Sequence, residues 1–384
     1  MQQRKIFIEA QRLFRAHKHG MDVVALELLQ RLRNRTPAYS FNVLVKHDED
    51  HCLQNSDSLT VSSLSSIFYP LWEQWLLPKQ TGNSKNNLLH CTGNTAPLFS
   101  SVPLLVTIHD LIFLEKNYLF SKEGGSLYQR FGNYYRRLVV PIVARKAKHI
   151  ITVSEYQRNI IIERLKINPE KISVVYNGVD NRFFEHEEVP VLSNTLMKYG
   201  IGFPYIFFMG NTEPRKNTKG AIEAFKIFCE QNPKLPHTLV IKGLTAQQLS
   251  EKIKECGAEK YASRIHRLGY IDYADLPLIY QGAAVLWFPS FSEGFGLPII
   301  ESMASGTPVI TSCTSVMPEI AGDAVLYIDP AEPRQLAIQT QVILQNEVLK
   351  NELVEKGSKR AACFTWERST NDLMKVYDRL MGEM

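Results

Sequence analysis

The sequence predicts an α/β protein built from two doubly wound domains. Short apolar runs with strand character alternate with longer helical patterns along the chain, and this alternation is typical of parallel sheets with helices on both faces. The chain has 384 residues, which is enough for two domains that each form a core. In such sheets ligands bind beyond the carboxyl ends of the strands, so functional residues are expected in the loops that follow strands.

The expected strands form one group in each half of the chain. Those of the first half are Lys5–Ile8, Phe41–Val45, Leu88–Cys91, Leu104–Ile108, His149–Val153 and Lys171–Val175. Those of the second half are Tyr205–Met209, Thr238–Lys242, Arg264–Leu268, Ala284–Phe288, Pro308–Thr311 and Ala324–Ile328. The polar stretch Glu185–Val191 is the best linker candidate. We therefore expect domains at residues 1–185 and 186–365.

Composition is that of an ordinary globular protein, with 22% charged and 45% hydrophobic residues. The net charge of +5 suits anionic substrates or lipid headgroups, but it is too small to indicate nucleic acid. The six cysteines include no CxxC pair, which fits a reducing compartment and gives no metal-site spacing. No apolar run approaches the roughly 20 residues that span a bilayer. We expect a cytoplasmic protein, with contact to the inner face of the membrane as an open alternative.

The most informative segment is SEGFGLPIIESMASGTPV, Ser292–Val309. Glu293 and Glu301 flank a glycine-rich loop that lies between an apolar strand-like run and a helix expected over Pro298–Ser305. Such a loop directs backbone N–H groups and a helix N-terminus at one point, which favours a phosphate or another anion. Ionised carboxylates accept hydrogen bonds from hydroxyl groups. A nucleotide-sugar meets both requirements.

This segment resembles the E-x7-E motif of the large mannosyltransferase- and glucosyltransferase-type family of retaining GT-B glycosyltransferases. Other family landmarks follow in family order: VTIHD (Val106–Asp110), TVSE…VVYNGVD (Thr152–Asp180), FMGNTEPRKN (Phe208–Asn217) and HRLGYI (His266–Ile271). The resemblance covers nearly the whole chain and is weakest at the N-terminal end. It implies a GT-B fold, in which two Rossmann-like domains face a cleft and the final helix, residues 366–384, crosses back to the N-terminal, acceptor-side domain.

The resemblance also assigns roles around the glycine-rich loop. Glu293 would contact hydroxyls of the donor sugar, and Glu301 would contact the ribose hydroxyls of the nucleotide. The sugar and phosphates would be lined by the amides of Gly294, Phe295, Gly296 and Leu297. The ordinary alternative is that both carboxylates are solvated, but glycines let the backbone approach a ligand closely and favour the functional interpretation.

Arg215 and Lys216 follow an expected strand and precede a helix. Two cations there would neutralise a diphosphate and stabilise its charge as it departs. Lys216 aligns with the family's phosphate lysine, whereas Asn211 stands where the family often has arginine, which places more weight on Arg215. The alternative is a basic surface loop. The segment containing Tyr270 and Ile271 resembles the one whose backbone pairs with the nucleotide base.

In the first domain, His109 follows an expected strand. By resemblance it contacts the donor sugar or the reacting centre, with Asp110 as a candidate to orient its ring. Gly20, in the loop HKHGMD, is expected to present amides to a phosphate or the acceptor. The family often has two glycines there, whereas this chain has Gly20 followed by Met21. An ordinary surface loop is an equal alternative.

The stretch Phe131–Ile150 mixes aromatic, arginine and lysine residues. It would suit a helix lying in a membrane interface, but Pro141 interrupts it. Amphipathic helices in α/β domains usually face the core, so a helix that covers the sheet is the favoured interpretation.

The resemblance thus implies a retaining transferase that moves a hexose, with mannose from GDP-mannose favoured, to a glycan or lipid-linked saccharide in polysaccharide biosynthesis. The leaving phosphate would help to deprotonate the acceptor. The sequence contains no metal-ligand cluster, so we expect metal-independent transfer with no cofactor besides the donor. UDP-glucose, UDP-galactose and a rhamnosyl nucleotide are alternative donors. A sugar-nucleotide epimerase and a non-catalytic sugar-nucleotide binder are alternatives from other classes.

Overall fold

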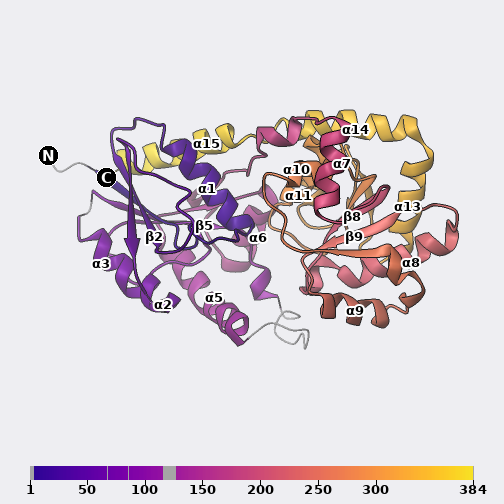
Figure 1. The fold of residues 1–384 in the computed structure, drawn as a ribbon. Coiled ribbons are helices and arrows are strands. Elements are labelled where there is room, and N and C mark those ends of the chain that lie inside the picture. Colours follow the sequence, from indigo (N-terminus) through magenta and orange to yellow (C-terminus); the bar gives the residue numbers. More distant parts are fainter. Residues whose placement is uncertain (1–3, 67, 85, 116–126, 384) are drawn as a thin grey trace. The chain divides into compact units, whose positions relative to one another are not determined.

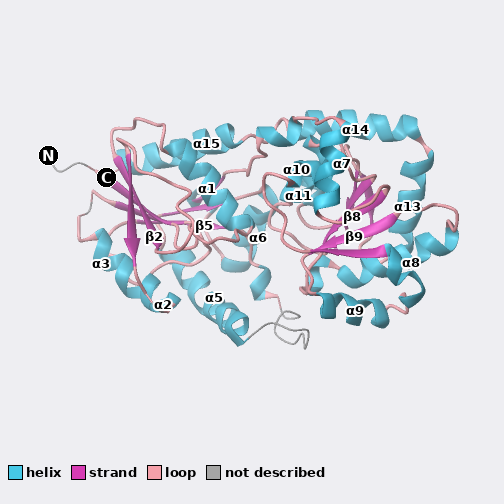
Figure 2. Ribbon diagram, viewed as in Figure 1, coloured by secondary structure: helices cyan, strands magenta, loops and turns pink. Residues whose placement is uncertain are grey.

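The computed structural model describes residues 4–66, 68–84, 86–115 and 127–383. The chain forms two compact units, and each contains a parallel sheet with covering helices (Figure 1, Figure 2). One unit holds the described residues up to Gly178 and the C-terminal stretch from Trp366, and the other holds Val179–Thr365. The predicted α/β class with two doubly wound halves is confirmed.

Within the described residues, the sheet of the first unit has seven parallel strands in the order β3-β2-β1-β4-β5-β6-β7. They are β1 (Lys5–Glu9), β2 (Ser40–Lys46), β3 (Leu59–Leu64), β4 (Leu88–Cys91), β5 (Leu104–Ile108), β6 (His149–Thr152) and β7 (Ile172–Val174). The order reverses between β1 and β4. Doubly wound sheets bind ligands at such a switch point.

Among the residues that the structure describes, this unit has the helices α1 (Gly20–Leu32), α2 (Tyr69–Leu71), α3 (Leu77–Thr81), α5 (Leu127–Lys146), α6 (Glu155–Leu165) and α15 (Trp366–Gly382). A π-helical turn η1 (Trp72–Leu76) joins α2 to α3, and 3-10 turns lie at η2 (Ile112–Leu114) and η3 (Pro169–Lys171). No helix within the described ranges is long and apolar enough to cross a membrane.

Successive residues of β1 point to opposite faces of the sheet and enter two different cores. Ile6 and Ile8 pack in one core with Leu29 of α1 and Tyr377 of α15. Phe7 packs in the other core with the valines of α5. Helix α15 is also held by hydrogen bonds, since the Tyr377 hydroxyl lies 2.7 Å from His90 Nδ1. The final helix therefore belongs to the first unit, as the resemblance implied.

The sheet of the second unit contains six parallel strands among the residues described, in the order β10-β9-β8-β11-β12-β13. They are β8 (Tyr205–Met209), β9 (Thr238–Lys242), β10 (Ile265–Leu268), β11 (Val285–Phe288), β12 (Val309–Ser312) and β13 (Leu326–Ile328). The switch point lies between β8 and β11, which pair directly.

The helices of the second unit are α7 (Val189–Lys198), α8 (Thr218–Gln231), α9 (Ala246–Glu255), α10 (Leu276–Gln281), α11 (Leu297–Ala304), α12 (Met317–Ala321), α13 (Pro333–Gln345) and α14 (Glu347–Ala361). Its 3-10 turns are η4 (Asn181–Phe184), η5 (Pro214–Lys216) and η6 (Glu259–Arg264).

Three details differ from the sequence prediction. Strand β3 was not expected, because it is an edge strand in which polar residues alternate with apolar ones. The proposed linker Glu185–Val191 runs into α7, and the division falls after Gly178, because Val179 N donates to Phe364 O at 2.9 Å inside the second unit. Pro141 lies inside α5 and does not interrupt it.

Candidate active site

The loop after β8 carries two cations to the switch point of the second unit. It ends in the turn η5 and in Asn217, whose left-handed backbone (φ 56°) begins α8. The buried Asn217 amide donates to Pro289 O at 3.1 Å and to Pro330 O at 2.7 Å, and its Oδ1 accepts from Gly220 N at 3.2 Å. Asn217 therefore ties this loop to the segments that follow β11 and β13. Sequence reasoning did not single it out.

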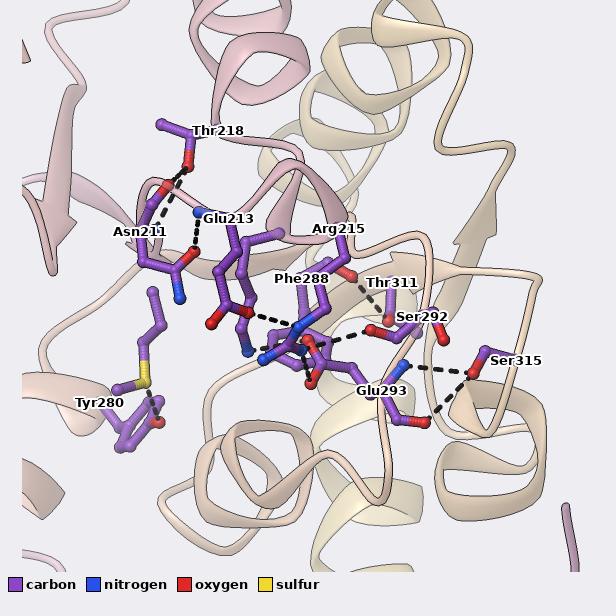
Figure 3. Close-up of polar contacts among 12 residues, drawn as sticks. Asn211, Glu213, Arg215, Thr218, Tyr280, Phe288, Ser292, Glu293, Thr311 and Ser315 are labelled. Atoms are coloured by element: carbon purple, nitrogen blue, oxygen red, sulfur yellow. Dashed lines mark hydrogen bonds and ion pairs between the residues drawn. The ribbon is translucent and has the colours of Figure 1, made fainter. Parts of the chain in front are cut away.

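Arg215 and Lys216 converge on Glu293. Arg215 Nη1 lies 2.6 Å from Glu293 Oε2, and Lys216 Nζ lies 2.7 Å from Glu293 Oε1. Arg215 Nε also donates to Glu213 Oε2 at 2.6 Å, and Figure 3 shows these side chains gathered beside the ring of Phe288. Two cations and a carboxylate thus meet where β8 and β11 end.

The electrostatics of this cluster fix the charge of Glu293, which is only 7% exposed. Burial alone would raise the pKa of Glu293, but the charges of Lys216 and Arg215 outweigh it and lower the pKa to about 2. The carboxylate is therefore ionised at neutral pH. An ionised carboxylate only accepts hydrogen bonds, which is the property needed to hold sugar hydroxyls.

The predicted glycine-rich loop connects Glu293 to α11. Gly296 has φ +105°, and a Cβ there would lie 3.3 Å from Ile299 Cδ1, so only glycine fits without strain. The side chain of Phe295 is buried against Phe364, with ring centroids 5.8 Å apart. The backbone of Gly294, Phe295, Gly296 and Leu297 leads directly to the N-terminus of α11. This end of the helix favours an anion.

Glu301 lies one helical turn further along α11 and is buried. Its Oε2 accepts from the Tyr280 hydroxyl at 2.8 Å (Tyr280 is also shown in Figure 3). Burial raises the pKa of Glu301 to about 7, and the Tyr280 hydrogen bond and the charge of Lys242 oppose this rise. Lys242 is the last residue of β9, and this position at a strand end was a signal in the sequence for a candidate site residue. Nothing in the sequence indicated Tyr280.

Gly243 shapes the loops beside the candidate site, and the sequence analysis did not single it out. It follows β9 with φ +103°, and a Cβ there would lie 2.1 Å from Gly210 O. The loops after β8 and β9 therefore pass so closely that only glycine is accommodated. A glycine directly after an expected strand was the available signal.

The remaining predicted donor residues lie on the same edge of the sheet. Asn211 shapes its own loop, since its Oδ1 accepts from Glu213 N at 2.8 Å and its carbonyl accepts from Thr218 Oγ1 at 2.6 Å (Figure 3). Tyr270 is exposed and Ile271 is buried. Both follow β10, which β9 separates from β8. They therefore lie two strands away from the Glu293 cluster.

In the first unit, His109 is buried at the carboxyl end of β5. Its backbone N donates to Asn94 Oδ1 at 2.7 Å, and its Nε2 lies 2.8 Å from Thr92 O. Because a carbonyl only accepts, Nε2 carries the proton and Nδ1 is left as an acceptor. Burial lowers the pKa of His109, which keeps the ring neutral. Asp110 Oδ1 accepts from Ile112 N at 3.2 Å, and the Asp110 charge opposes the lowering of the His109 pKa.

Gly20 opens α1, where His19 N donates to Asp22 Oδ2 at 2.9 Å. A Cβ at Gly20 would meet no atom within 4 Å, so the surrounding structure does not require glycine. Lys18 in the same loop forms an ion pair with Asp50.

Two buried carboxyl groups near the switch point of the first unit were not predicted. Glu9 ends β1, and burial raises its pKa to about 7. Glu73, in the π-helical turn, accepts from Gln74 Nε2 at 2.9 Å, from the Tyr135 hydroxyl at 2.6 Å, and from Tyr69 and Thr95. Across the residues described, no group of three or more His, Cys, Asp or Glu side chains is arranged to hold a metal ion.

Two family models match this chain, one in each unit. The model described as "Glycosyl transferases group 1" matches residues 199–360, and "Glycosyltransferase Family 4" matches residues 18–183. The chain belongs to the GT-B glycosyltransferases of group 1. This glycosyltransferase carries Arg215, Lys216, Glu293 and Glu301 inside the first of these matches.

Relatives of this glycosyltransferase include enzymes of O-antigen assembly. O-antigen chain mannosyltransferase B of Escherichia coli is 30% identical over 237 residues, which are 61% of this chain and 61% of that protein. O-antigen chain mannosyltransferase RfbU of Salmonella typhimurium is 26% identical over 282 residues, 73% of this chain and 71% of that protein. The match to the first relative thus spans about three-fifths of its length.

Solved structures share the fold. Anabaena HepE in complex with UDP-glucose has a TM-score of 0.74 at 18% identity, covering 98% of this chain and 100% of HepE. Sucrose-phosphate synthase from Thermosynechococcus elongatus has a TM-score of 0.72 at 18% identity and covers 100% of both chains. These likenesses confirm the GT-B fold with two Rossmann-like domains.

Proposed function

We propose that this glycosyltransferase moves mannose from GDP-mannose to a hydroxyl of a glycan or lipid-linked saccharide, with retention of configuration and without a metal ion. The observation that carries the proposal is the convergence of Arg215 and Lys216 on Glu293 at the switch point of the second unit. Two relatives named as O-antigen mannosyltransferases support the choice of sugar and of a polysaccharide acceptor.

The donor would lie across the cluster with its diphosphate against Arg215 and Lys216. These cations now neutralise Glu293, and a diphosphate would share them. As the glycosidic bond breaks, negative charge grows on the leaving phosphate, and fixed cations stabilise that charge more than they stabilise the bound donor. Glu293 would then accept hydrogen bonds from the sugar, and Glu301 from the ribose.

Retention needs the acceptor oxygen to arrive on the face from which the diphosphate leaves. The leaving phosphate itself would take the proton of the attacking hydroxyl, so no carboxylate nucleophile is required. In the first unit, the neutral ring of His109 would offer Nδ1 as an acceptor to a hydroxyl of the sugar or of the acceptor. This division of roles uses no metal ion, because two basic side chains supply the positive charge.

The test is a transfer assay with purified enzyme, GDP-mannose and a lipid-linked saccharide acceptor. The proposal predicts a mannosylated product whose new linkage keeps the anomeric configuration of the donor by NMR, at a rate that EDTA does not change. An inverted linkage would exclude retention. Loss of activity in EDTA that a divalent ion restores would exclude metal independence.

UDP-sugars are the alternative donors, since the structure of HepE holds UDP-glucose. The same assay run with UDP-glucose and UDP-galactose decides between the nucleotides. An epimerase would convert the donor without any acceptor, and product analysis of that reaction tests this alternative. We place the reaction on the cytoplasmic side of the membrane, where nucleotide-sugars and lipid-linked acceptors meet.

A further inference from the structure

The segment from Phe68 to Thr81 exposes large apolar side chains on one side. Trp72 and Leu77 point into the core and are fully buried. Phe68, Leu71 and Trp75 are exposed, and Trp75 reaches 64% exposure. Single exposed apolar residues are common on protein surfaces, but three along one short helical segment form the beginning of a patch.

Helix α5 continues this patch because it is apolar on two sides. Val139, Val140 and Val143 pack into the core of the first unit, as the favoured prediction for this helix required. A second stripe remains exposed at helical spacing, and it consists of Phe131, Tyr134, Leu138 and Ile142. Covering the sheet does not explain this second stripe.

Contacts join the two segments into one surface, which we call the aromatic face: Phe68, Leu71, Trp75, Phe99 and the exposed stripe of α5. The rings of Phe68 and Phe131 have centroids 5.8 Å apart. Lys146 Nζ lies 4.7 Å from the ring centroid of Phe99, which is 79% exposed. Figure 1 shows α2, α3 and α5 along one edge of the first unit. Trp75 and Phe99 line a groove of about 700 Å³ on this face.

Most charges around the aromatic face are positive. Lys79, Lys146 and Lys148 line the groove, and Arg136 and Arg145 lie on α5. Lys148 is paired with Glu383, whose carboxylate lies 3.2 Å from Lys148 Nζ. Glu73 is the single acidic residue in the sequence stretches 68–81 and 131–148, and it is buried among its hydrogen-bond donors. Exposed aromatic residues bordered by cations complement a surface whose outer layer is anionic and whose inner layer is apolar.

We propose that the aromatic face binds the surface of an anionic lipid bilayer. The aromatic side chains would enter the interface between headgroups and acyl chains, and the lysines and arginines would contact lipid phosphates. A second copy of the chain fits this face less well, because a symmetric pairing would bring the same cations against one another. The docking would hold the first unit at the membrane, where a lipid-linked acceptor resides.

The test uses the full chain and vesicles of phosphatidylcholine alone or mixed with phosphatidylglycerol. The protein has four tryptophans, of which Trp72, Trp287 and Trp366 are buried and Trp75 is exposed. The emission change on vesicle binding therefore reports Trp75. We expect co-sedimentation with the anionic vesicles, a shift of emission to shorter wavelength, and weaker binding at high salt.

Three variants make the experiment decisive. The double variant W75A/F99A should weaken vesicle binding by at least about tenfold, with unchanged thermal unfolding because both side chains are exposed. W75F should keep binding and lose the emission shift. The matched control V348A removes an exposed apolar side chain from the second unit and should bind like wild type. The proposal is overturned by absent co-sedimentation, by undiminished binding of W75A/F99A, or by a solution dimer that W75A/F99A abolishes.

Discussion

Replacing Glu293 with glutamine tests how much the charge of this carboxylate contributes to the stability of the folded protein. Glutamine keeps the shape of the side chain and removes its charge. In the native protein the carboxylate contacts Arg215 at 2.6 Å and Lys216 at 2.7 Å in a buried position. In the E293Q variant Arg215 keeps its ion pair with Glu213, whereas Lys216 loses its carboxylate partner.

The magnitude follows from the pKa of Glu293, which falls from 4.5 to about 2. At about 1.36 kcal/mol for each pKa unit, the surroundings favour the ionised form by about 3 kcal/mol. The folded-state pKa is depressed, so this stability is present above pH 4.5 and is lost as the pH falls toward 2. E293Q should therefore be less stable than wild type by about 3 kcal/mol at pH 7, and the difference should shrink below pH 4.5.

Urea unfolding of both proteins at pH 7 and at pH 3 measures this difference. The control is E355Q, which breaks the exposed pair between Glu355 and Lys359 on α14 and should leave the unfolding midpoint unchanged. Equal stability of E293Q and wild type at pH 7, or the same destabilisation at pH 3 as at pH 7, would refute this role of the Glu293 charge.

Three further predictions concern the second unit. K216A should lower the rate of mannose transfer by roughly 10²- to 10³-fold, and initial rates should stay normal in K219A, which changes an exposed lysine of the neighbouring helix. Because the pKa of Glu301 is about 7, donor affinity measured by calorimetry should rise about tenfold from pH 6 to pH 8 as the carboxylate ionises. E301Q should remove this dependence, and a slope that persists would exclude Glu301. G243A should lower the free energy of unfolding by about 2 kcal/mol or more, whereas G20A should be tolerated; equal stabilities would refute the close approach of the two loops.

Most strands of both sheets were predictable because buried parallel strands are apolar throughout. The predicted ranges Tyr205–Met209 and Thr238–Lys242 coincide with β8 and β9. Strand β3 escaped because it is half exposed and carries alternating polar residues. The continuation of α5 through Pro141 also escaped, since packing of the neighbouring valines into the core outweighs the local penalty of proline.

The candidate site residues could be picked out from the sequence where they are close together along the chain. The glycine-rich loop indicated Glu293, and the strand that ends before Arg215 and Lys216 indicated the cations. Contacts between residues that are far apart in the sequence had no local signal. Examples are the hydrogen bond from the Tyr280 hydroxyl to Glu301 and the one from the Asn217 amide to Pro330 O.

The orientation of side chains was equally hidden from the sequence. The contact of the His109 ring with a backbone carbonyl, Thr92 O at 2.8 Å from Nε2, had no signal in the sequence. Burial of Glu9 and Glu73 follows from three-dimensional packing, which sequence spacing does not reveal.

Calorimetric titration of the purified protein with GDP, GDP-mannose and UDP-glucose tests the central claim most directly, with K216A measured alongside. We expect saturable binding of GDP and GDP-mannose to wild type, weaker binding of UDP-glucose, and a loss of at least about tenfold in affinity for GDP-mannose in K216A. Absence of binding by any nucleotide, or binding that K216A leaves unchanged, would contradict a nucleotide-sugar site at Arg215, Lys216 and Glu293.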